Sequence, residues 1–167
     1  MAALTMISTM VIAVPSPTMG FIHVGDALVI LCGVICGPLL GGLAAGLGSM
    51  LADLFMGYTI SALPTFIIKF VSAFIVGYLF KKMNREEHKR YKLPLASVIA
   101  EINMVLGYFI YHLLKIPILE MSFTKATLSA GIANAIGGLL FDILQGLVGI
   151  ILANILYPII KNATFKK

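Results

Sequence analysis

Long apolar runs, separated by short polar segments, set the pattern of this chain. A membrane-crossing α-helix needs about 20 apolar residues to span roughly 30 Å of hydrocarbon, and the alternation typical of a transmembrane β-strand is missing. The pattern therefore predicts an all-α bundle in the membrane, formed by residues 1–167 as a single domain. The apolar runs are Ala2 to Val14, Ala27 to Phe55, Ile60 to Phe80, Leu93 to Leu114 and Ile132 to Ile160.

The second run is too long for one perpendicular helix. Residues 26–56 would extend about 46 Å if wholly helical. Gly37-Pro38 interrupts the run, and proline suits the first turn of a new helix because it has no backbone N–H to donate. Two helices that meet there give six spans in total, while one kinked helix is the alternative. The first run is short for a span, and it lacks the basic start and cleavage site of a signal peptide. Pro15 to Gly20, which follow it, are expected to form an extended, turn-rich loop.

Positive charge predicts the orientation of the bundle. Residues 81–92, KKMNREEHKRYK, contain six of the twelve Lys and Arg residues, and the C-terminal KNATFKK is also basic. Because positive loops stay in the cytoplasm, we expect both termini inside and residues 15–24, 57–60 and 116–131 outside. The net charge of +5 thus reflects topology. Such loops hold anionic lipid headgroups or a cytoplasmic partner, and no nucleic-acid partner is expected.

Composition narrows the functional class. With 60% hydrophobic and 11% charged residues, the chain has too little polar surface for a soluble globule. The sequence has no phosphate-binding GxxxxGK[ST], no H-E-x-x-H and no nucleophile motif, so we expect neither an enzyme nor a cofactor. Cys32 and Cys36 share a helix face without a nearby His or acidic ligand, so no metal site is expected.

Small residues recur at four-residue spacing on two predicted helices. Gly42 and Gly46 form a GxxxG pattern, and Thr5, Thr9 and Ala13 form a narrow stripe on the first helix. Small residues at this spacing let helices approach closely in lipid. Each stripe either packs inside the bundle or docks against another subunit.

Polar side chains inside apolar helices identify the candidate binding site, because intramembrane ionisable groups are costly and face a cavity or one another. On the fifth predicted helix Glu101, Tyr108 and His112 recur at spacings of seven and four, which places them on one face. On the sixth, Asn134 and Asp142 share a face with Gly138 and Gly146, flanked by Gln145. Lys69 lies inside the fourth.

Each candidate also has a structural interpretation. Lys69 with Glu101 or Asp142 forms a buried ion pair in one alternative, and His112 is an interfacial side chain in another. Asp26 is expected to cap the short helix that it begins. His23, just before it, remains a candidate ligand residue, while Asp53 is expected to cap a loop or form a pair.

Several segments together resemble the S components, the substrate-binding subunits of energy-coupling factor (ECF) vitamin transporters. In a branch associated with hydroxymethylpyrimidine and pyridoxine, a loop reading roughly I-N-L-G-D-A leads into a short helix. It continues through L-G-P-L-x-G-x-L-A-G-x-L-G-S-x-L-A-D-L. The resemblance covers nearly the whole chain. The matching segments here are Ile22–Ala27, Gly37–Leu39, Gly41–Leu54, Ile67–Lys69, Ala100–Glu101, Gly107–Tyr108 and Leu144–Gly149.

The resemblance implies a six-helix subunit of a bacterial plasma-membrane importer. Such a subunit captures a vitamin or precursor from outside and works with a transmembrane coupling (T) subunit and two ATP-binding cassette ATPases. Pyridoxine or hydroxymethylpyrimidine is the first expectation, and riboflavin or pantothenate the alternative. The resemblance also implies a first outer loop that folds over the ligand, and docking through small residues, for which Thr5, Thr9 and Ala13 are the candidates. A self-sufficient secondary carrier is the main rival, although no inverted repeat is visible.

Overall fold

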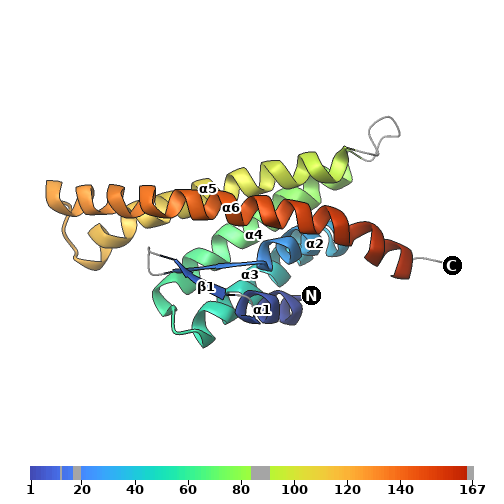
Figure 1. The fold of residues 1–167 in the computed structure, drawn as a ribbon, viewed down its shortest axis with the longest axis horizontal. Helices are drawn as coiled ribbons and strands as arrows, with labels where there is room; N and C mark the ends of the chain where they lie inside the picture. The colour runs from blue at the N-terminus through green and yellow to red at the C-terminus, as the bar shows by residue number, and fades with distance from the viewer. Residues whose placement is uncertain (12, 17–19, 84–90, 165–167) are drawn as a thin grey trace.

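Six helices and one β-hairpin make up the described part of the computed structural model, residues 1–11, 13–16, 20–83 and 91–164 (Figure 1). Helices α3 to α6 are long and apolar enough to cross a membrane, whereas α1 and α2 have only 10 and 12 residues. The all-helical prediction is confirmed for the bundle, with four full-length candidate spans. The elements are α1 (Ala2–Val11), β1 (Ala13–Ser16), β2 (Gly20–His23), α2 (Gly25–Cys36), α3 (Pro38–Phe55), α4 (Thr59–Lys82), α5 (Lys92–Leu119) and α6 (Lys125–Thr164).

The break between α2 and α3 lies at the predicted position. Gly37 separates the two helices with φ of 81°, a conformation that glycine adopts without steric cost, and Pro38 begins α3. A Cβ on Gly41 would overlap the carbonyl group of Cys32. Gly41 therefore lets α3 fold back closely along α2. The single kinked helix is wrong.

The hairpin was not predicted. Strands β1 and β2 pair antiparallel, with Ala13 opposite His23 and Ser16 opposite Gly20. They extend from the end of α1 and the beginning of α2 toward one end of the bundle, and the turns between α3 and α4 and between α5 and α6 lie toward the same end (Figure 1). We call this the hairpin end. Since β2 leads directly into α2, the hairpin fixes where α2 begins, at mid-bundle.

Close helix contacts build the core around α2. Ala27, Ile30 and Leu31 of this helix form one buried cluster with Val76 of α4 and Ala96 of α5. The alanines in this cluster bring the helices near enough for dispersion contacts to stabilise the bundle where lipid supplies no hydrophobic driving force.

The GxxxG face of α3 packs inside the chain. A Cβ on Gly42 or Gly46 would lie about 3 Å from the ring of Phe70 or Phe66 of α4. Phe66 and Phe70 stack with centroids 6.0 Å apart, and Phe74 continues the series. Of the two alternatives for this stripe, the structure therefore supports packing within the bundle.

The small-residue stripe of α1 also faces inward. Thr5 and Thr9 are fully buried, and the Thr5 hydroxyl lies 3.5 Å from the sulfur of Cys32. A Cβ on Gly48 of α3 would come within 2.8 Å of Thr5 Cβ. These two threonines cannot touch another subunit while α1 keeps this packing, which does not agree with the docking role expected for them. The side chain of Ala13 lies outside the described part.

Helices α5 and α6 form a long antiparallel pair beside the other elements (Figure 1). Gly131 allows the close approach, because a Cβ there would overlap the carbonyl oxygen of Leu113. With 40 residues, α6 is about 60 Å long at 1.5 Å per residue, twice the thickness of the hydrocarbon layer. The pair extends beyond the hairpin and α3 at the hairpin end, and it carries most of the predicted site residues.

Candidate functional site

A buried ion pair lies at the centre of the bundle. Asp26 begins α2, Lys69 comes from α4, and the Lys69 ammonium group contacts one carboxylate oxygen of Asp26 directly. Their side chains are 0% and 1% exposed. Gln145 of α6 donates from Nε2 to the other carboxylate oxygen, at 2.8 Å. Asp26 thus joins three helices through one carboxylate.

This arrangement corrects two expectations. Asp26 lies in the first turn of α2, as predicted, but its carboxylate does not cap that helix and binds Lys69 and Gln145 instead. Lys69 forms a buried ion pair, as one alternative held, yet its partner is Asp26 rather than Glu101 or Asp142. A pair separated by 43 residues depends on how α2 and α4 pack, which a local pattern does not encode.

His23 of β2 connects the hairpin to this network. Its backbone N–H donates to Gln145 Oε1 at 3.0 Å, and its Nδ1 accepts from the N–H of Gly25 at 3.0 Å. An accepting Nδ1 places the proton of the neutral ring on Nε2. Burial, only partly offset by Asp26, lowers the pKa of His23 to about 4, so the ring is neutral at pH 7. Gln145 therefore holds both the hairpin and the ion pair.

A second polar series leads from α5 to α3. The Lys69 ammonium lies 5.0 Å from the ring centroid of Tyr108, within range of a cation–π contact. The Tyr108 hydroxyl donates to the Thr65 hydroxyl of α4 at 3.3 Å, and Thr65 in turn hydrogen-bonds Asp53 of α3. Asp53 is thus hydrogen-bonded inside the bundle rather than exposed. This series fixes the ring of Tyr108 through α4.

Aromatic rings extend from Tyr108 toward the hairpin end. The rings of Tyr108 and His112 stack with centroids 6.2 Å apart, and Tyr111 lies 5.3 Å from His112 at a tilt. Asn134 of α6 donates to the backbone carbonyl of His112 at 3.1 Å. His112 is buried within the bundle.

Three buried polar atoms of α5 and α6 have no hydrogen-bond partner among the residues that the structure describes. They are Glu101 Oε2 and His112 Nδ1 on α5, and Asp142 Oδ2 on α6. Glu101 is 4% and His112 7% exposed. A Cβ on Gly146 would lie 3.1 Å from Glu101 Oε2, so this glycine leaves room for the carboxylate between α5 and α6. Unpaired buried acceptors cost free energy and call for a partner.

The predicted site residues therefore divide into two groups. His23, Lys69 and Gln145 belong to one hydrogen-bonded network, which Asp26 completes. Glu101, His112 and Asp142 carry unpartnered atoms on α5 and α6, the helices that also carry Tyr108 and Asn134. Sequence reasoning missed Thr65, whose neighbours are apolar and whose hydroxyl gave no signal by itself. No cluster of His, Cys, Asp or Glu suited to a metal ion occurs in the part of the chain described.

A helical membrane protein with paired charges, unpartnered carboxylates and stacked rings inside its spans belongs to the class that binds polar solutes within the bilayer. Comparison with models of protein families narrows the class. Residues 1–162 match the ECF-type riboflavin transporter, S component, so the chain belongs to this family. No curated protein matches the sequence.

Membership makes the chain a membrane substrate-binding subunit of an ECF transporter and not an enzyme. The family works with a T subunit and ATPase modules and has a small-molecule vitamin as its substrate. The resemblance to S components is confirmed. The hydroxymethylpyrimidine and pyridoxine branch is not part of that match, because the description of the family names riboflavin.

Proposed function

We propose that the chain captures a small, flat heteroaromatic vitamin or precursor from outside the bacterial plasma membrane and delivers it inward with the T subunit and two ATPases. One observation carries the proposal: the unpartnered carboxylate oxygens of Glu101 and Asp142 lie on the helix pair that also carries the stacked rings of Tyr108 and His112. Acceptors beside an aromatic wall suit a flat ring that carries hydrogen-bond donors.

Pyridoxine and hydroxymethylpyrimidine are the first candidates because of the charges. Lys69 forms its direct ion pair with Asp26, and neither Glu101 nor Asp142 forms an ion pair in the described residues. A protonated ring nitrogen, an amino group or a hydroxyl would satisfy these oxygens. His23, Lys69, Asn134 and Gln145 complete the proposed substrate contacts.

Riboflavin is the second candidate, and the family description favours it. Its larger ring system stacks on aromatic side chains, and its ring N–H is a donor for the same acceptors. Pantothenate is less suited, because its carboxylate would face Glu101 and Asp142 without a free cation.

The orientation belongs to the same proposal. The hairpin end would face outward, since the basic segment 81–92 and the basic C-terminal residues favour the cytoplasm. The site would then open between the outer parts of α4, α5 and α6.

Mass spectrometry of ligand that co-purifies with the protein tests the identity most directly. Titration of the purified protein with pyridoxine, hydroxymethylpyrimidine, riboflavin and pantothenate then ranks affinities. We expect one of the first two to bind most tightly. A protein that binds riboflavin alone would support the second candidate, and a protein that binds no vitamin would refute the proposal.

Transport assays in vesicles separate an S component from a self-sufficient carrier. The protein alone should bind its vitamin and fail to accumulate it, whereas addition of the T subunit, both ATPases and ATP should give uptake. Accumulation by the lone protein under an ion gradient would contradict this.

A further inference from the structure

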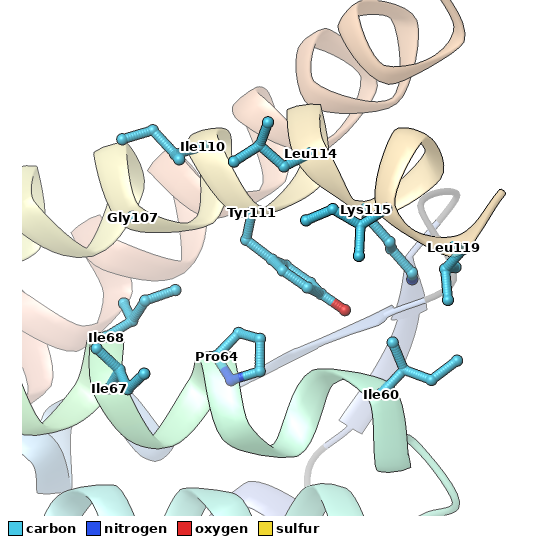
Figure 2. A pocket seen from close by; sticks show the side chains of 11 residues that line it. Ile60, Pro64, Ile67, Ile68, Gly107, Ile110, Tyr111, Leu114, Lys115 and Leu119 are labelled. Carbon is cyan, nitrogen blue, oxygen red and sulfur yellow. The ribbon is translucent and has the colours of Figure 1, made fainter. Parts of the chain in front are cut away.

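A groove runs between α4 and α5 near the hairpin end, and Tyr111 is the one residue of the aromatic series that lines it in the described part of the chain (Figure 2). Its volume is about 360 Å³, and we call it the α4–α5 groove. A Cβ on Gly107 would press on Ile68 at 2.9 Å, so the glycine keeps the groove open at its base. The groove is lined by Ile60, Pro64, Ile67, Ile68, Gly107 and Ile110, with Tyr111, Leu114, Lys115, Ile118 and Leu119 toward the end of α5.

The sides of the groove are apolar and face outward. Ile60, Ile67 and Ile110 are 56%, 53% and 55% exposed, as expected of side chains that meet lipid tails. A polar vitamin would find few partners here. Among the described residues that line the groove, the Tyr111 hydroxyl is the one polar side-chain group apart from Lys115, and it already bonds to Ser61 at 2.9 Å.

Positive charge is confined to one end of the groove. Lys115 lies on the penultimate turn of α5, and its ammonium group is 5.7 Å from the ring centroid of Tyr111. No carboxylate forms an ion pair with Lys115 within the described ranges. The groove therefore combines a long apolar floor with one unneutralised cation near the end of a membrane helix.

We propose that the α4–α5 groove binds an anionic phospholipid, with one acyl chain along the isoleucines and the headgroup phosphate at Lys115. Charge complementarity selects this occupant. A zwitterionic lipid offers Lys115 no net charge, whereas an anionic headgroup gains about fivefold in local enrichment from one lysine near the membrane surface. The lipid would also fill the gap beside Tyr111 and so support the helix that carries the aromatic rings of the site.

The chain contains no tryptophan, which makes a single introduced tryptophan a clean reporter. Ile67→Trp places one at the rim of the groove, and Ile136→Trp places one on α6 at a side chain that is 61% exposed and outside the groove. Each full-length variant is reconstituted in nanodiscs that contain increasing fractions of phosphatidylglycerol or phosphatidylcholine with the same brominated chain. Tryptophan quenching is then measured. Because both lipids carry bromine at the same depth, the ratio of quenching by the two lipids does not depend on how deep the tryptophan lies.

We expect Ile67→Trp to be half-quenched at an about fivefold lower fraction of brominated phosphatidylglycerol than of brominated phosphatidylcholine. Ile136→Trp should show no difference between the two. Adding Lys115→Gln to the groove reporter should abolish the preference, and Lys115→Arg should retain it.

Three results of the lipid titrations would overturn the proposal, and a fourth would come from added vitamin. They are equal quenching of the groove reporter by both lipids, a preference that survives Lys115→Gln, and loss of the preference in excess inorganic phosphate, which would indicate a site for the free anion. Relief of quenching by added vitamin would likewise assign the groove to the transported solute.

Discussion

The two halves of the polar interior differ in how completely their groups are paired. Around Asp26, the side chains of Lys69 and Gln145 and the backbone of His23 supply charge or hydrogen bonds at fixed positions. Between α5 and α6, oxygen atoms of Glu101 and Asp142 have no partner in the described residues. We therefore expect the first half mainly to position the hairpin, and the second to supply most of the ligand contacts.

This difference has a physical consequence for mutation. Removing one member of a paired buried network leaves its partner desolvated and alone, which destabilises the fold. Removing an acceptor that has no partner relieves a cost in the free protein, so the loss appears only when ligand binds. Stability and affinity should therefore respond to different residues.

The largest effect is expected for Lys69→Met. The change leaves the carboxylate of Asp26 buried without its cation, which should destabilise the folded protein by about 3–5 kcal/mol. The midpoint of thermal unfolding in detergent measures this. Lys81→Met, on the exposed end of the same helix, is the matched control and should change stability by less than about 0.5 kcal/mol. A Lys69→Met protein as stable as the control would show that the pair is not structural.

Gln145→Leu should have the next largest effect. It removes the donor to Asp26 and the acceptor for the His23 N–H, and it leaves both groups buried, at a cost of about 1–3 kcal/mol. Backbone hydrogen exchange at His23 should accelerate, because the hairpin loses its link to α6. Gln145→Glu is a useful comparison, since it keeps the acceptor for His23 and places a second carboxylate against Asp26. Unchanged exchange in Gln145→Leu would mean that the hairpin is held by other contacts.

Glu101→Gln should separate the two halves most clearly. Loss of the charge should weaken vitamin binding at least about tenfold, the scale of one charge-assisted hydrogen bond, while thermal stability is kept or raised. Isothermal titration with the vitamin that co-purifies gives the affinity. Asp142→Asn is the parallel variant on α6. Unchanged affinity in Glu101→Gln with an intact fold would remove this residue from the site.

Much of the fold and part of the candidate site could be predicted from local signals in the sequence. The length of the apolar runs gave the helices, Gly37-Pro38 gave the break, and the helical period correctly grouped Glu101 and His112, which are both buried on α5. Apolar run length, proline and period are properties of neighbouring residues. A single sequence contains them directly.

The rest depends on tertiary packing or on weak signals. The hairpin strands have only four residues each, which is too short to show a clear alternation of polar and apolar residues. Pro15 lies within β1, and a proline in such a segment favours the prediction of a turn. The ion-pair partner of Lys69 could not be chosen from the sequence, because the choice requires knowing that α2 begins at mid-bundle. The candidate acids are Asp26, Asp53, Glu101 and Asp142. The inward direction of Thr5 likewise follows from the position of Cys32, which only the folded chain defines.

The smallest effect is expected for Tyr108→Phe, which tests where the two halves meet. Tyr108 touches the paired half through Lys69 and carries the ring that stacks on His112 in the unpaired half. The substitution keeps the ring and removes only the hydrogen bond to Thr65, so stability should fall by about 0.5–1.5 kcal/mol and vitamin affinity by less than about threefold.

Tyr108→Leu, which also removes the ring, provides the contrast. If the ring forms the wall of the site, Leu should weaken binding well beyond Phe, by a further amount on the scale of one aromatic contact, about 0.5–1.5 kcal/mol. Titration of both variants against the same vitamin compares them directly. Equal losses of vitamin affinity in Tyr108→Phe and Tyr108→Leu would mean that the ligand contacts the hydroxyl, which Thr65 holds, rather than the ring. The polar groups that contact the ligand would then extend from Glu101 to α4.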